Sequence, residues 1–223
     1  MTAISQDVVY LFDVDNTLLD NDAVQADLSA HLENMYGAKA RDRYWAVFET
    51  LRAELGYADY LGALQRYRLE APDDVRLLQL SSFLIDYPFA DRLFPGALAT
   101  IGRCARNGLC AILSDGDVVF QPRKVHRSGI WDAVQGNVLI YLHKEQMLDA
   151  VARHLPARHY VMVDDKLRIL TAMKRIWRER LTTVFVRQGH YAKDSATIAQ
   201  YPAADLTAER IGDFAGVDTS RTS

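Results

Sequence analysis

The sequence predicts an α/β fold: a doubly wound, Rossmann-like parallel sheet that carries an inserted all-helical domain. Apolar runs of strand length recur along the chain, helical patterns separate most of them, and one long stretch after the first run holds helical patterns alone. Runs of Val, Ile, Leu and Phe without polar alternation are typical of strands buried on both faces, as in a parallel sheet covered by helices. Alternation of such strands with helices predicts double winding.

The predicted strands share one design. VVYLFD ends at Asp13, CAILSD ends at Ser114 and Asp115, and YVMVDD ends at Asp164 and Asp165. A fourth run, TTVFVRQG, begins near residue 182. Because the carboxyl ends of parallel strands lie at one edge of the sheet, where ligands of such folds bind, we expect these polar side chains to gather there.

The predicted core helices have ordinary start and stop signals. PGALATIGRCARNG opens with Pro95 and closes with Gly108, and apolar residues recur at helical spacing in KEQMLDAVARHL and KLRILTAMKRIWRER. Residues 20 to 92 instead contain three or four consecutive helical patterns with no strand between them, which predicts a separate helical bundle. We therefore expect a catalytic core over 1–18 and 93–223 and a helical cap over 19–92.

Composition excludes several classes of protein. The 223 residues carry a formal net charge of −3 without a basic face or tail, which argues against a nucleic-acid partner. Cys104 and Cys110 lack a zinc-binding spacing and are expected to be reduced core residues. We expect neither a secretion signal nor a membrane span, hence a cytoplasmic protein. We separately expect a monomer or homodimer with a small phosphorylated metabolite as its partner.

Asp13 and Asp15 lie two positions apart, so on an extended segment both side chains point the same way, toward the later aspartates. Such a cluster either raises its own pKa values or needs a cation to stay ionised, and oxygen ligands without His or Cys suit Mg²⁺. One carboxylate can then attack phosphorus while the second handles the proton. The Ser114 hydroxyl, the turn at Asp115 and Gly116, and the cation of Lys144 would hold the phosphoryl oxygens.

These residues resemble the four ordered motifs of the haloacid dehalogenase-like hydrolase superfamily: DVDNT from Asp13 to Thr17, Ser114, Lys144 and the Asp164–Asp165 pair. The layout resembles a phosphatase-type member with a helical cap between the first two motifs. The resemblance implies that Asp13 is the nucleophile and a magnesium ligand. It further implies the remaining roles: Asp15 as general acid/base and backbone ligand, Thr17 as loop support, Ser114 and Lys144 as phosphoryl holders, and Asp165 as metal ligand beside Asp164.

The chain also departs from the family pattern. Asp115 stands where the family often has Asn or Ser, so that it adds negative charge near a phosphate site and can point away from it. HKEQ replaces the frequent Lys-Pro pair around Lys144, which leaves Lys124 as a rival phosphate ligand. Which of Asp164 and Asp165 contacts the metal is left open.

Structural roles compete with the functional ones. The DVDNT stretch could be an Asx-type turn, Ser114 or the aspartate pair could cap a helix, and Lys144 could lie at the surface. We expect the neighbouring His143 and Lys166 to be solvent-exposed, and the segment 57–68 to pack as a helix with a solvated face rather than to meet substrate.

The resulting prediction is a Mg²⁺-dependent phosphatase that acts on a small phosphomonoester through an aspartyl-phosphate. A phosphomutase would use the same motifs but would transfer the phosphoryl group to a second hydroxyl. A binding protein on a scaffold that has lost its activity is the third hypothesis, and the full set of motif residues argues against it.

Overall fold

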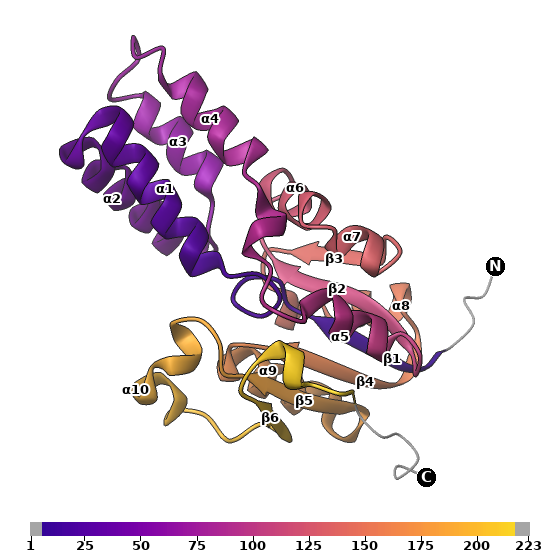
Figure 1. Cartoon of the computed structure of the whole chain (residues 1–223). Helices are drawn as coiled ribbons and strands as arrows, with labels where there is room; N and C mark the ends of the chain where they lie inside the picture. Colours follow the sequence, from indigo (N-terminus) through magenta and orange to yellow (C-terminus); the bar gives the residue numbers. More distant parts are fainter. Residues whose placement is uncertain (1–5, 217–223) are drawn as a thin grey trace.

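The structure is a computed structural model that describes residues 6–216. Within that range the strands form one six-stranded sheet, all parallel, in the order β3-β2-β1-β4-β5-β6. Their bounds are β1 (Gln6–Phe12), β2 (Leu109–Asp115), β3 (Val138–Tyr141), β4 (Ala157–Asp164), β5 (Leu181–Val186) and β6 (Leu206–Ala208). The doubly wound parallel sheet that the sequence predicts is therefore confirmed (Figure 1).

Helices cover both faces of this sheet. Along β1, Val8, Tyr10 and Phe12 pack on the face covered by α5 (Ala97–Cys104), α6 (Phe120–Arg127) and α7 (Ile130–Ala133). Val9 and Leu11 pack on the opposite face, under α8 (Leu148–His154) and α9 (Leu167–Trp177). Because β1, β2, β4 and β5 are buried on both sides, the uninterrupted apolar runs of the sequence are explained.

The segment between β1 and β2 is helical, as predicted. It contains α1 (Asn21–Tyr36), α2 (Ala38–Leu55), α3 (Tyr60–Arg68) and α4 (Leu77–Asp86), which extend away from the sheet in Figure 1. Asp20 caps α1 by accepting from the N–H of Ala23, and Asp59 caps α3 in the same way. We name α1–α4 the helical insertion; the exact domain boundaries at residues 18/19 and 92/93 stay a prediction.

The strand order places the site. The sheet runs in opposite directions from β1, through β2 to β3 on one side and through β4 to β6 on the other. The crevice at the carboxyl ends of β1 and β4 is therefore the switch point at which doubly wound sheets bind ligands. Asp13 follows β1, and Asp164 ends β4. None of the helices in residues 6–216 has the length and apolar character that a membrane span requires.

Candidate active site

The loop after β1 is held in a fixed shape. Asn16 has a φ of 60°, and its side-chain oxygen accepts hydrogen bonds from the N–H groups of Asn21 and Asp22, at 3.0 and 3.2 Å. The loop therefore turns directly into α1. Gly189, from the segment after β5, lies against Asn16 so closely that an added Cβ would be 2.4 Å from the Asn16 Cβ. This packing fixes the carboxylates on either side of Val14 relative to the sheet.

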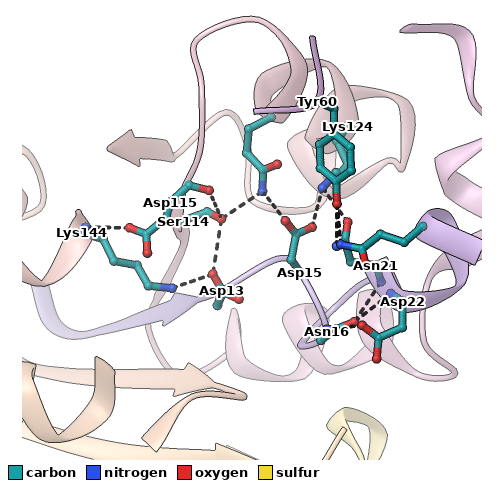
Figure 2. A network of polar contacts seen from close by, with 12 residues as sticks. Asp13, Asp15, Asn16, Asn21, Asp22, Tyr60, Ser114, Asp115, Lys124 and Lys144 are labelled. Atoms are coloured by element: carbon teal, nitrogen blue, oxygen red, sulfur yellow. Dashed lines mark hydrogen bonds and ion pairs between the residues drawn. The ribbon is translucent and has the colours of Figure 1, made fainter. Parts of the chain in front are cut away.

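Asp13 lies at the centre of a buried polar cluster. The Lys144 ammonium is 2.6 Å from Asp13 Oδ1 and 2.7 Å from Asp164 Oδ2, and the Ser114 hydroxyl donates to Asp13 Oδ1 at 3.3 Å. Figure 2 shows Ser114 and Lys144 converging on Asp13. Burial raises the pKa of the Asp13 carboxyl, but the opposing charges of Lys144 and Lys166 outweigh it, so that this pKa lies below its ordinary value.

Three carboxylates meet at the switch point. Asp13, Asp164 and Asp165 each offer an oxygen within 4.8 Å of the others, and all three residues are buried. Burial and the neighbouring carboxylates raise the pKa of Asp164 and hold that of Asp165 well above its ordinary value. Within the described residues, Asp13 Oδ2 and both oxygens of Asp165 lack a hydrogen-bond donor. Unpartnered buried carboxylate oxygens are costly, and a divalent cation would satisfy them.

The two adjacent aspartates differ in their environment. Asp164 Oδ1 accepts from the N–H of Lys166 at 2.8 Å, while its other oxygen pairs with Lys144. Asp165 lines the cleft above the sheet with both oxygens unpartnered. Of the two, Asp165 thus offers the free oxygens.

Asp15 lies apart from the central cluster. Its side chain is 24% exposed, and its oxygens lie 2.6 Å from Lys124 Nζ and 3.4 Å from Gln121 Nε2. Lys124 therefore contacts the second carboxylate of the first motif, whereas Lys144 contacts the first. In Figure 2 Lys144 reaches Asp13, and Lys124 reaches Asp15.

The other predicted site residues have partners of their own. Asp115 Oδ1 accepts from the backbone N–H of Lys144 at 2.7 Å, and burial raises the pKa of this carboxyl. The N–H of Gly116 donates to the Tyr141 carbonyl at 2.9 Å, so this donor is engaged. Both residues still line the cleft. Thr17, which lies within the loop after β1, is fully buried.

A cleft of about 480 Å³ separates the sheet edge from the helical insertion. The core contributes Asp15, Asp165 and Lys166 to its wall, and the insertion contributes Arg52 and Tyr60. The two walls touch across it: Arg52 donates to the Tyr191 hydroxyl, and a Cβ on Gly56 would be 2.8 Å from the His143 ring.

Two expectations about neighbouring residues change. The predicted exposure of Lys166 is wrong, because it is half-buried and lines the cleft. Burial lowers the pKa of its ammonium, but the charges of Asp165 and Asp13 outweigh burial, so this pKa lies above its ordinary value. His143 is likewise half-buried rather than exposed, against Gly56. The segment 57–68 packs as expected through Ala63 and Leu64, which lie in the core. Tyr57 also lines the cleft, and its contact with substrate stays a hypothesis.

Sequence reasoning missed two partners of the motif residues. Gln121 is buried and donates to Ser114 Oγ at 3.1 Å, and Asn16 shapes the first loop. Gln121 and Lys124 are three residues apart at the start of a helix, which places them on one face. That spacing was the only available signal.

Comparison with known proteins identifies the family. A family model described as haloacid dehalogenase-like hydrolase matches residues 9–176. The chain therefore belongs to the haloacid dehalogenase-like hydrolases. The resemblance drawn from its motifs is confirmed at the level of the family.

Solved structures agree with this assignment. A haloacid dehalogenase-like hydrolase from Burkholderia xenovorans LB400 is 66% identical, with a TM-score of 0.90 over 95% of this chain and 99% of that one. L-2-haloacid dehalogenase from Xanthobacter autotrophicus, with chloropropionic acid covalently bound, is 19% identical, with a TM-score of 0.59 over 92% and 95%. A HAD-hydrolase from Bacillus subtilis bound to magnesium is 14% identical, with a TM-score of 0.59 over 92% and 95%. A comparison with curated proteins gave no match.

Proposed function

We propose that this hydrolase cleaves a small phosphomonoester through an aspartyl-phosphate formed on Asp13. The observation that carries the proposal is the division between two carboxylates. Asp13 is buried and ion-paired with Lys144, while Asp15 faces the cleft, where a leaving group would stand. A nucleophile and a separate proton carrier are what a two-step phosphoryl transfer needs.

In the first step a carboxylate oxygen of Asp13 attacks phosphorus. The bond between phosphorus and the ester oxygen breaks, its electron pair stays on the leaving oxygen, and that oxygen takes a proton from Asp15. Ser114 and Lys144, which already contact Asp13, would donate to the phosphoryl oxygens as their charge develops. The alcohol then departs into the cleft.

In the second step water hydrolyses the aspartyl-phosphate. Asp15, now ionised, takes a proton from the attacking water, the bond between phosphorus and the Asp13 oxygen breaks, and inorganic phosphate leaves. Both carboxylates return to their initial state. The acid of the first step is therefore the base of the second.

The acidic cluster fits a magnesium ion. Asp13 and Asp165, with their unpartnered buried oxygens, would hold it, with Asp164 beside them and the backbone carbonyl of Asp15 as the further ligand that the family resemblance implies. Bound there, Mg²⁺ would neutralise the carboxylates and the phosphate, so that one anion can approach another.

Dehalogenation is the main competing chemistry, because structural neighbours include L-2-haloacid dehalogenases. A halide departs as a stable anion and needs no proton, whereas an alkoxide must be protonated. The cleft-facing Asp15 has a use in phosphomonoester hydrolysis and none in halide departure. It therefore favours phosphoryl chemistry.

The cleft favours a small soluble substrate. Its volume of about 480 Å³ suits a metabolite, and the helical insertion would act as a cap that limits entry and excludes bulk water. A phosphorylated metabolite, rather than a polymer or a membrane, is the proposed partner.

The test is a phosphomonoester panel with purified protein and Mg²⁺, run beside 2-haloacids with halide detection. We expect phosphate release that stops in EDTA, returns with added Mg²⁺ and falls by at least about 10²-fold in Asp13→Asn. Halide release without phosphate release would overturn the proposal in favour of a dehalogenase. Turnover only with an added sugar bisphosphate would indicate a phosphomutase, and inactivity throughout would indicate a binding protein.

A further inference from the structure

Lys124 is a fully buried cation that the motifs do not explain. Its side chain is 0% exposed, on α6, and its ammonium lies 5.4 and 6.0 Å from the ring centres of Phe120 and Tyr60. A buried ammonium is costly unless a counter-charge and hydrogen-bond acceptors accompany it. Within residues 6–216, the carboxylate that pairs with it is that of Asp15, at 2.6 Å.

Asp15 is held from one helix. Lys124 donates to its Oδ1 at 2.6 Å and Gln121 Nε2 donates to its Oδ2 at 3.4 Å, both from α6. The carboxylate stands on a loop, where an unsupported side chain would sample several rotamers. Two donors on a packed helix restrict the Asp15 carboxylate to one orientation, in which it lines the cleft.

The ammonium is in turn fixed by the helical insertion. Its second acceptor is Asn21 Oδ1, at 3.1 Å, and Asn21 Nδ2 donates to the Tyr60 hydroxyl at 3.2 Å. Gln25 donates to the same hydroxyl at 2.8 Å. Figure 2 shows this chain of contacts from Asp15 through Lys124 to Asn21 and Tyr60. The Lys124 ammonium is therefore held between Asp15 of the core and Asn21 of the helical insertion.

We propose that Lys124 is a positioning residue, which holds the Asp15 carboxylate where it exchanges protons with the leaving oxygen and with water. The inference rests on the proposed phosphatase function. It replaces the role of phosphate ligand considered from the sequence, because the buried ammonium is directed at Asp15 and Asn21. A substrate phosphate on Asp13 would instead meet Lys144.

The test compares Lys124→Met, Lys124→Arg and Asp15→Asn with the wild type. One substrate is 4-nitrophenyl phosphate, whose leaving group needs little protonation, and the other is the best alkyl phosphomonoester of the panel. In Lys124→Met we expect the release of 4-nitrophenolate in the first turnover to persist. The steady-state turnover of 4-nitrophenyl phosphate and the rate of hydrolysis of the alkyl ester should each fall by about 10²-fold or more. Asp15→Asn should show the same pattern, and Lys124→Arg should recover part of it.

The control is Arg123→Met, which removes the neighbouring cation of α6. The Arg123 guanidinium lies 3.1 Å from Asp86 Oδ1 on the exposed side of α6. Its loss should therefore leave the hydrolysis rates of both substrates unchanged. Equal loss of first-turnover and steady-state rates in Lys124→Met would overturn the inference, since misfolding or lost phosphate binding would have that effect. Unchanged hydrolysis of the alkyl ester would also overturn it. An inactive wild type would overturn the proposed function itself, and the inference with it.

Discussion

At the scale of the residue, two carboxylates two positions apart have different surroundings. Asp13 is buried between Lys144 and Ser114, and Asp15 stands at the cleft with Lys124. Each has its own lysine, so the expected repulsion between them is balanced locally by two cations from different elements. The loop between them is what keeps the two environments separate.

Because that loop packs against Gly189, substitution of Gly189 should disturb it. Gly189 has a φ of +71°, and a Cβ there would clash with Asn16 at 2.4 Å, whereas Gly37 has a φ of +90° with nothing within 4 Å. Gly37→Ala should therefore cost only the backbone strain of that conformation, about 1–3 kcal/mol in free energy of unfolding. Gly189→Ala should cost about 1–3 kcal/mol more and displace the loop of Asp13 and Asp15.

Urea unfolding of both variants and phosphate release measure these effects. We expect Gly37→Ala to keep the wild-type turnover and Gly189→Ala to lose most of it. Equal stability of the two variants would contradict the close packing of Gly189 on Asn16.

At the scale of the element, the long strands could be predicted from the sequence, whereas the edge strand β6 could not. β1, β2, β4 and β5 are apolar on both faces, and that composition gives a strong signal. β6, three residues long with no buried side chain, gives none. Its position depends on contacts with β5 and α9, from residues 22 and 31 positions away in sequence. Local sequence patterns do not report such contacts.

Asp205, directly before β6, links this edge of the sheet to β5 and α9. Its carboxylate accepts from the Thr183 N–H and hydroxyl at 2.8 Å and pairs with Lys174 at 2.8 Å. Burial raises the pKa of Asp205, but these hydrogen bonds outweigh it, so the folded-state pKa is lowered. The stabilisation is therefore complete above the ordinary value of about 3.9 and is lost as the pH falls through the lowered one.

Asp205→Asn should lose about 1 kcal/mol of free energy of unfolding at pH 7, a small value because solvent screens this partly exposed group. The deficit should shrink as the pH falls below about 3.9, so that it is smaller at pH 3 than at pH 7. Urea unfolding at both pH values, with the exposed Asp73→Asn as control, checks this. A deficit of the same size at pH 3 would rule out the charged interaction as its cause.

At the scale of the whole molecule, the site joins two regions that the sequence keeps apart. The strand-end residues were predictable, because a parallel sheet brings its carboxyl ends to one edge. The partners of Asp15 were not, since Lys124 and Asn21 are 103 residues apart and meet only when the insertion packs on α6. Lys166 was misjudged for a related reason, as the start of α9 turns its side chain toward the cleft.

The most direct test of the central claim is to detect a phosphoryl group on Asp13. Asp15→Asn protein, with the base of the second step removed, is mixed with Mg²⁺ and 4-nitrophenyl phosphate, quenched in acid, digested and analysed by mass spectrometry. We expect the added mass of one phosphoryl group on the peptide that contains Asp13, and no added mass when Asp13→Asn is combined with Asp15→Asn. Phosphate release by the wild type without that adduct, or an adduct on another residue, would show that Asp13 is not the nucleophile.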